Sequence, residues 1–288
     1  MVKVARPRLG VPFPYVGGKC RLAARIVRAL PEHEAYVEVF GGSGAVLFAK
    51  PPCKVEVLND VDGDVVNFFR VLRDEAQRER LVELLRWTPY AREEFEAQVS
   101  APVPADPVER AWRFFVIARM SFGGYRPANC GKAYQGATRF RWRRSVRVNK
   151  CEPRVFAGKV HQLEAFGDRL RTVFVERRDF SYILNRWDGE EVMFYLDPPY
   201  VTHEGYYDNG SFGQVRHFEL ASCLAAIKGR AVVSYYPHET VDQLYPPDRW
   251  RRIELEAVKN AQRTSRGGTR ERTTELLLCN FDGEGRRL

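Results

Sequence analysis

The strongest constraint on the fold is a repeated alternation between two hydrophobic patterns. Short apolar or β-branched runs bounded by turn residues predict seven strands, at residues 35–40, 54–58, 172–175, 192–196, 231–235, 252–256 and 275–279. Apolar residues at helical spacing lie between several of these runs, at residues 22–30, 45–50, 65–72 and 217–227. This alternation predicts an α/β fold with a mostly parallel sheet of about seven strands and helices on both faces.

The alternation is interrupted once, between residues 58 and 172, and this interval is too long for an ordinary connection between a strand and a helix. Helical spacing recurs there at residues 79–87, 91–99 and 108–120, with a proline-rich joint at 101–107. We therefore expect residues 73–170 to form an inserted, largely helical domain. Residues 1–72 and 171–288 would then form the main α/β domain.

Positive charge is concentrated in one segment of the insertion. The chain carries a net charge of +9, and residues 126–159 hold ten basic residues against one acid. The aromatic residues Tyr134, Phe140, Trp142 and Phe156 are interleaved with them and could stack on bases. A solvated basic loop is the alternative, but single-signed charge mixed with aromatic residues favours a nucleic-acid surface. The basic residues expected to contact DNA are Arg126, Lys132, Arg139, Arg141, Arg143, Arg144, Arg147 and Lys150.

Composition excludes several other classes of protein. The chain is 44% hydrophobic, which excludes general disorder, and no uninterrupted apolar run is long enough for a membrane helix. The first ten residues do not resemble a secretory signal, so a cytoplasmic location is expected. The cysteines and histidines show neither a C-x-x-C nor an H-x-x-x-H pattern, so we expect no metal site.

The first candidate site is a glycine-rich turn, Phe40-Gly41-Gly42-Ser43-Gly44, between a predicted strand and a predicted helix. Glycines let the backbone approach a ligand, and a helix N-terminus favours an anionic group. Asp60 ends the next strand about 20 residues later, where doubly wound folds bind ribose hydroxyls. A purely structural turn would explain the glycines alone, but their spacing from Asp60 favours a nucleoside site.

The second candidate site is Asp197-Pro198-Pro199-Tyr200, directly after the strand at 192–196. Two consecutive prolines fix the backbone, so the Asp197 carboxylate and the proline carbonyls form a rigid set of acceptors. Such a set suits a planar amino group, and Tyr200 could stack on its ring through the aromatic face rather than the hydroxyl. A strand stopped by a proline turn is the alternative explanation of this motif alone.

Four motifs together resemble the Dam-type (D12 class) DNA adenine-N6 methyltransferases, which use S-adenosylmethionine. The four are FPYVGGK at 13–19, the glycine-rich turn at 38–44, Asn59-Asp60 and the DPPY tetrad at 197–200. Their order, with the cofactor motif first and the tetrad last, is that of the α group of amino-methyltransferases. The resemblance implies a Rossmann-like methyltransferase domain that carries an inserted target-recognition domain.

The resemblance also implies roles for individual residues. The implied cofactor-binding residues are Tyr15, Lys19, Glu38, Phe40, Gly41, Gly44, Asp60, Asp179, Phe180 and Asp197. The implied catalytic residues are those of the tetrad, Asp197, Pro198, Pro199 and Tyr200. A second DNA contact is implied at the loop 263–272, through Arg266 and Arg270.

The resulting hypothesis is methyl transfer from S-adenosylmethionine to the exocyclic amine of an adenine flipped out of duplex DNA. We expect a monomer without a metal. Two other functions stay open at this stage: methylation of an amino group in RNA or of a protein glutamine, and nucleic-acid binding without catalysis. The motifs decide neither the recognised DNA site nor whether a restriction endonuclease is partnered with the enzyme.

Overall fold

A seven-stranded sheet organises the protein. The computed structural model describes residues 9–125, 140–141, 151–201, 212–258 and 272–288. The strands are β1 (Ala35–Glu38), β2 (Val55–Asn59), β3 (Val173–Glu176), β4 (Val192–Leu196), β5 (Arg230–Tyr235), β6 (Arg251–Val258) and β7 (Arg272–Cys279). Their order across the sheet is β3-β2-β1-β4-β5-β7-β6, and among these strands β7 alone runs in the direction opposite to the other six. The predicted mostly parallel α/β fold is confirmed.

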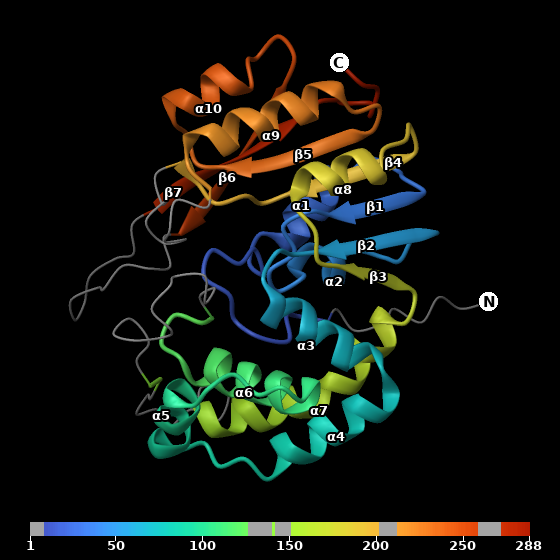
Figure 1. Cartoon of the computed structure of the whole chain (residues 1–288). Coiled ribbons are helices and arrows are strands. Elements are labelled where there is room, and N and C mark those ends of the chain that lie inside the picture. Colours follow the sequence, from blue (N-terminus) through green and yellow to red (C-terminus); the bar gives the residue numbers. More distant parts are fainter. Residues whose placement is uncertain (1–8, 126–139, 142–150, 202–211, 259–271) are drawn as a thin grey trace.

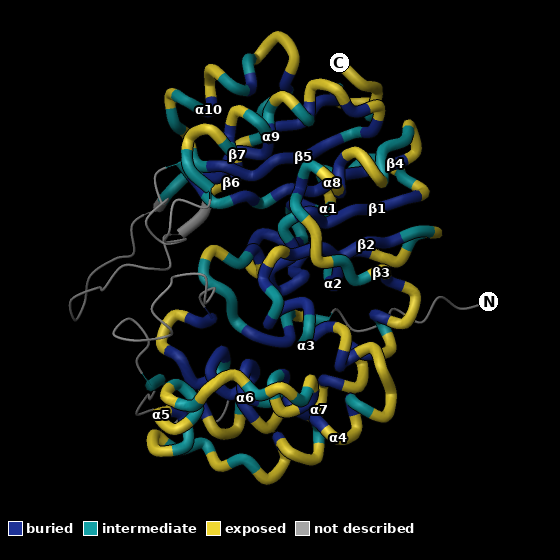
Figure 2. Tube along the Cα trace, viewed as in Figure 1, coloured by how far each residue is buried: buried dark blue, intermediate teal, exposed yellow. Residues whose placement is uncertain are grey.

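Alternate residues of the strands supply two hydrophobic cores, one on each face of the sheet. Val37, Phe194 and Val233 point to the face covered by α8 (Phe180–Arg186), α9 (Gln214–Ala226) and α10 (Glu239–Leu244). Tyr36 and Tyr195 point to the face covered by α1 (Ala23–Ala29), α2 (Ala45–Ala49) and α3 (Gly63–Arg73). This is the period of two that a pleated strand requires. Figure 2 shows the central strands buried throughout and the exposed residues on the outer helices and turns.

The interval between β2 and β3 is largely helical, as the sequence predicts. It contains α4 (Glu75–Arg86), α5 (Arg92–Ser100), α6 (Pro107–Met120) and α7 (Glu152–Leu170), which gather with α3 below the sheet (Figure 1). The sequence analysis missed α7, although Phe156, Val160 and Leu163 already show helical spacing. The sequence analysis considered the basic segment mainly for its charge, and it overlooked the apolar stripe that begins near the end of that segment, at Phe156.

The environment of Phe156 corrects one expectation. Phe156 was expected among the aromatic residues that stack on bases, but it is 4% exposed and packs against Phe115 and Tyr90 inside the helical layer. It lies in the same continuous core as Phe13 and Tyr195 of the α/β part. Its burial follows from its place on the apolar face of α7, so it cannot reach a nucleic acid without unfolding this core.

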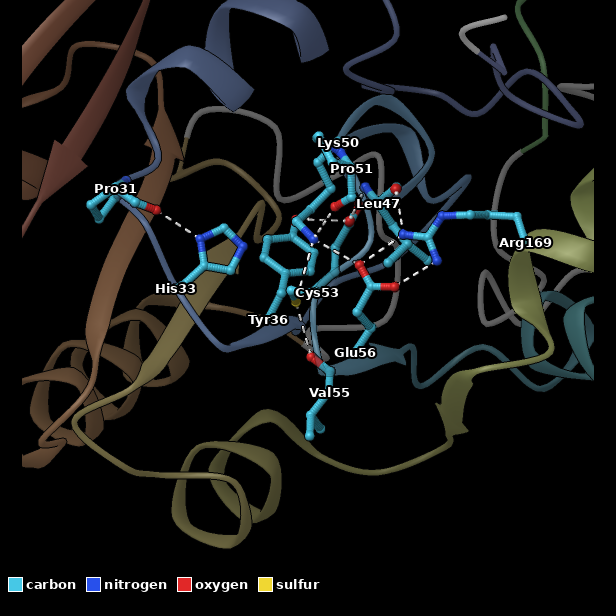
Figure 3. A network of polar contacts seen from close by, with 11 residues as sticks. Pro31, His33, Tyr36, Leu47, Lys50, Pro51, Cys53, Val55, Glu56 and Arg169 are labelled. Atoms are coloured by element: carbon cyan, nitrogen blue, oxygen red, sulfur yellow. Dashed lines mark hydrogen bonds and ion pairs between the residues drawn. The ribbon is translucent and has the colours of Figure 1, made fainter. Parts of the chain in front are cut away.

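A buried charge network ties α7 to the sheet (Figure 3). Glu56 of β2 accepts hydrogen bonds from Lys50 at 2.7 Å and from both terminal nitrogens of Arg169 at 2.6 and 2.7 Å. The Lys50 ammonium also lies 4.7 Å from the centre of the Tyr36 ring and donates to the Pro51 carbonyl. All three charged side chains are less than a tenth exposed. Two cations therefore depend on a single buried carboxylate.

No helix among the described residues combines the length and the apolar character needed to cross a bilayer.

Candidate functional site

The predicted motifs meet at one edge of the sheet, where parallel strands end in loops. Asn59, at the end of β2, donates to the carbonyls of Val39 and Arg178 at 2.8 and 3.0 Å and accepts from the Arg178 amide at 2.9 Å. Its side chain thereby joins the ends of β1, β2 and β3. Ligands of open α/β sheets bind at such an edge.

The glycine-rich turn is tight because two of its residues have left-handed backbones and a third has no room for a side chain. Gly42 and Gly44 have φ values of 47° and 67°. A Cβ at Gly41 would lie 2.8 Å from the Asn59 carbonyl oxygen. Gly44 faces the Phe48 ring and does not line the cavity described below, so its contribution is the shape of the turn.

The protein itself supplies an anion to the start of α2. The Glu38 carboxylate accepts hydrogen bonds from the Leu47 amide at 2.7 Å and from the Tyr36 hydroxyl at 2.9 Å. We expected the amides at the start of this helix to bind an anionic group of a ligand. For the Leu47 amide this expectation is wrong, because Glu38 already accepts its hydrogen bond. Burial raises the pKa of Glu38 to about 7 against the effect of these hydrogen bonds.

Asp60 shapes the turn and also faces the cavity. Its Oδ2 accepts from the Gly42 amide at 2.7 Å and its Oδ1 accepts from the Asp62 amide at 2.8 Å. Burial, with a smaller effect from the Asp62 charge, raises its pKa to about 6. Each carboxylate oxygen has a second lone pair, so Asp60 can accept further hydrogen bonds from a ligand.

These residues enclose a cavity of about 170 Å³. Nine of the ten predicted cofactor residues line it, all except Gly44: Tyr15, Lys19, Glu38, Phe40, Gly41, Asp60, Asp179, Phe180 and Asp197. The same wall includes Pro199 and two residues that the sequence analysis did not select, Phe212 and Arg216. The Gly-rich turn and two residues of the DPPY tetrad, Asp197 and Pro199, thus share one cavity, whereas Pro198 and Tyr200 do not line it.

Asp197 is already engaged by a cation. The Lys19 ammonium donates to Oδ1 and Oδ2 of Asp197 at 2.7 and 2.8 Å and to the Gly17 carbonyl at 3.1 Å. The Tyr200 hydroxyl oxygen lies 3.1 Å from Oδ1. Lys19 also lies 4.8 Å from the centre of the Tyr200 ring. Its ammonium therefore contacts both the carboxylate and the aromatic ring that the sequence assigned to a target amine.

Glu275 of β7 completes this cluster, and the sequence analysis missed it. Glu275 accepts a hydrogen bond from the Tyr200 hydroxyl, and its Oε1 lies 3.3 Å from the Lys19 ammonium. An acid at the start of the otherwise apolar run 275–279 was the available signal. The Tyr200 hydroxyl, to which the sequence analysis gave no role, contacts Asp197 and Glu275.

Two carboxylates share the one ammonium of Lys19 in this buried cluster. Burial raises the pKa of Asp197 and the pKa of Glu275, while Lys19 acts in the opposite direction on both. With both acids ionised, the three groups carry a net charge of −1. Such a pocket favours a ligand that brings positive charge or several hydrogen-bond donors.

Asp179, which also lines the cavity, caps the N-terminus of α8. Its Oδ1 accepts from the Ser181 amide at 3.0 Å and from the Ser181 hydroxyl at 2.6 Å, while its Oδ2 accepts from Arg216 of α9. Partial burial opposes ionisation, but these hydrogen bonds keep the pKa of Asp179 below its usual value. The Arg216 guanidinium lies 4.4 Å from the centre of the Phe180 ring.

Most of the predicted DNA contacts lie outside the described residues: Arg126, Lys132, Arg139, Arg143, Arg144, Arg147, Lys150, Arg266 and Arg270. Tyr134 and Trp142 lie outside them too. Arg141 is described, and it pairs with Glu152 at 3.2 Å. Phe140 packs against Tyr90 and Phe95.

No group of three or more His, Cys, Asp or Glu side chains arranged to hold a metal ion occurs within the part of the chain that the structure describes.

Comparison with known proteins gives a consistent family match. The family model of the D12 class N6 adenine-specific DNA methyltransferases matches residues 15–260. The matched region includes the glycine-rich turn, Asp60 and the tetrad.

Two similar proteins match over most of their length, and a third matches over about a quarter of its own. A protein of Lactococcus lactis subsp. cremoris named Type II methyltransferase M1.LlaDCHI is 26% identical over 94% of this chain and 95% of its own. The DNA adenine methylase of Escherichia coli strain K12 is 24% identical over 93% of this chain and 94% of its own. The DNA N-6-adenine-methyltransferase of Escherichia phage P1 is 30% identical over 65% of this chain but only 24% of its own.

Proposed function

Because this chain belongs to the D12 class of N6 adenine-specific DNA methyltransferases, we propose that its cavity binds S-adenosylmethionine and that Asp197 and Tyr200 hold the target adenine. The observation that carries this proposal is the position of Asp197 at the end of β4, in the wall of the cavity that Asp60 and Asp179 also line. Acceptors for a nucleoside and an acceptor for an amine therefore share one space.

The chemistry of the lining fits S-adenosylmethionine. Asp60 can accept from ribose hydroxyls, and Asp179 can accept from the amino group of the cofactor's adenine. Phe40 and Phe180, whose ring centres are 5.9 Å apart, offer aromatic surface for a purine. When bound, the cofactor would supply an electrophilic methyl group on a sulfonium ion.

The DPPY tetrad would orient the amine of the target base. An exocyclic amine conjugated with a purine is a poor nucleophile, because its lone pair is delocalised into the ring. Acceptors that take hydrogen bonds from its N–H groups favour a tetrahedral nitrogen, whose lone pair is then available for attack. Asp197 can accept one of these hydrogen bonds, and the rigid backbone of Pro198 and Pro199 holds a carbonyl for another. Catalysis would then consist mainly of orientation and electrostatic stabilisation.

The base amine must displace Lys19 from Asp197, and Glu275 gives Lys19 a second partner. The ammonium is 3.3 Å from Glu275, so it can remain paired while Asp197 accepts from the base. An ammonium left without a carboxylate in this buried place would cost several kcal/mol. Glu275 would therefore act as a positioning residue that makes Asp197 available.

The basic segment would deliver the substrate. Residues 126–159 precede and begin α7, and arginines in this segment can neutralise DNA phosphates. Gripping the duplex would offset the cost of flipping the base. We keep residues 73–170 as the proposed target-recognition domain, a monomer as the proposed state and the cytoplasm of a prokaryotic cell as the proposed location.

The test is methyl transfer from labelled S-adenosylmethionine to duplex DNA, RNA and a glutamine-containing peptide, assayed side by side. We expect N6-methyladenine in the duplex with wild-type protein and none with the Asp197→Ala variant. Preferential labelling of RNA or peptide would replace the proposed substrate. Absence of calorimetric cofactor binding would favour nucleic-acid binding without catalysis. Mapping methyladenine in DNA from expressing cells would identify the recognised site.

A further inference from the structure

Arg216 lines the cavity in a position that the proposed cofactor site leaves without a role. It lies in the first turn of α9 and lines the cavity together with Asp179 and Phe180. Its two terminal nitrogens contact different carboxylates, Glu219 on its own helix and Asp179 at the start of α8. Its side chain is 28% exposed, so the guanidinium is neither fully solvated nor fully buried.

These contacts fix the orientation of the guanidinium. Two carboxylates hold its nitrogens, and the Phe180 ring lies beneath its carbon at 4.4 Å. A planar, five-donor group held in this way can both stack and present donors in a defined direction. Arg216 therefore offers hydrogen-bond donors directly beside the acceptor Asp179, and its guanidinium lies over the Phe180 ring.

An adenine edge has the complementary order of groups, because its amino group donates and the neighbouring ring nitrogen N1 accepts. Asp179 can take the amino proton, and a free N–H of Arg216 can bond the ring nitrogen. Hypoxanthine, which carries a carbonyl and an N–H at these places, would set oxygen against Asp179 and a donor against Arg216.

We propose that Arg216 is a specificity-determining residue for the cofactor and forms with Asp179 the donor-acceptor pair that selects an adenosyl group over its deaminated form. This inference rests on the proposed function, since it presumes that an adenosyl cofactor occupies the cavity.

The test is calorimetric binding of S-adenosylhomocysteine and S-inosylhomocysteine, which needs no DNA and no turnover. Wild type should prefer the adenosyl compound by about 100-fold, because the deaminated edge loses two hydrogen bonds, one to Asp179 and one from Arg216, and each is worth about 10-fold. In the Arg216→Ala variant, S-adenosylhomocysteine should bind about 10-fold more weakly and S-inosylhomocysteine within about twofold of wild type. Unchanged binding of the second compound also shows that the cavity is intact.

Two further variants sharpen the result. Arg216→Lys keeps the charge but loses the planar fork, so it should lose most of the preference as Arg216→Ala does. Arg186→Ala is the matched control, because Arg186 is exposed on α8, lies 5.9 Å from the Trp187 ring and does not line the cavity. It should retain the full preference.

Three outcomes would overturn the inference. Equal weakening of both compounds in Arg216→Ala would indicate a structural role for Arg216. Tighter binding of S-adenosylhomocysteine by this variant would indicate that Arg216 competes with the cofactor for Asp179. Failure of the wild-type protein to bind either compound would overturn the proposed function as well.

Discussion

The ammonium of Lys19 lies 2.7 and 2.8 Å from the two carboxylate oxygens of Asp197, although 178 residues separate them in the sequence. One residue comes from the N-terminal motif and the other from the DPPY tetrad. The contact places a positive charge on the acceptor that the reaction needs.

Asp197→Ala should abolish methyl transfer while leaving cofactor affinity largely unchanged, because the lost carboxylate acts on the target amine. Asp197→Asn keeps one acceptor without the charge, and we expect a loss of roughly 10- to 1000-fold, about 1.4 to 4 kcal/mol of transition-state stabilisation. Single-turnover methylation of a duplex measures both. A near-normal rate for Asp197→Ala would contradict the mechanism.

Glu275→Gln should slow single-turnover methylation by about 10-fold, because Lys19 would lose the charged partner that accepts it and would stay on Asp197. S-adenosylhomocysteine affinity should stay within about twofold. Tyr200→Phe should also slow the reaction, since its hydroxyl contacts Glu275 and Asp197. Glu254→Gln, at an exposed position on β6, is the control. Parallel loss of cofactor affinity in Glu275→Gln would mean that the cluster is structural only.

Asp60 should make cofactor binding depend on pH. Its pKa is raised to about 6, so the carboxylate is ionised above this pH and protonated below it. A charged acceptor binds a ribose hydroxyl more strongly, so wild-type affinity should fall about 10-fold as the pH drops through 6, towards that of Asp60→Asn. Calorimetry with S-adenosylhomocysteine between about pH 5 and 8 measures both. A constant ratio of the two affinities would remove Asp60 from the binding site.

Glu56→Gln should destabilise the fold by about 3–5 kcal/mol, because Lys50 and Arg169 would be left buried without a carboxylate. Glu34→Gln is the matched control, since Glu34 pairs with Lys54 at 2.6 Å on the surface and both side chains are more than half exposed. The control should cost no more than about 1 kcal/mol. Urea unfolding at neutral pH compares the two variants, and equal losses would contradict the assigned role of the network.

Neutralising Arg143 and Arg144 should weaken DNA binding and flatten its salt dependence. Each lost phosphate contact lowers the slope of log K against log salt by about 0.9, so two contacts should lower it by roughly two. We leave Arg141 unchanged because it pairs with Glu152. Cofactor affinity should not change. An unaltered salt slope would identify this segment as a solvated face.

The sequence by itself determined the layers of the fold and the position of the site. Short apolar runs separated by helical spacing indicate a sheet covered on both faces, and all seven predicted strands are confirmed. Motifs that follow such strands must meet at one edge. Gly41, Asp60 and Asp197 therefore line one cavity, as expected from the sequence.

Only the tertiary structure decided which side chains pair within the site. Local patterns report whether a residue belongs to a strand or a helix, but they do not report which charge from a distant element fills a buried position. Glu275 and Arg216 became visible only when β7 and α9 packed beside the tetrad and Asp179. In the same way, Phe156 lies in a segment whose composition is typical of DNA binding, but its side chain belongs to the core. It lies on the apolar face of α7, and burying that face removes apolar surface from water.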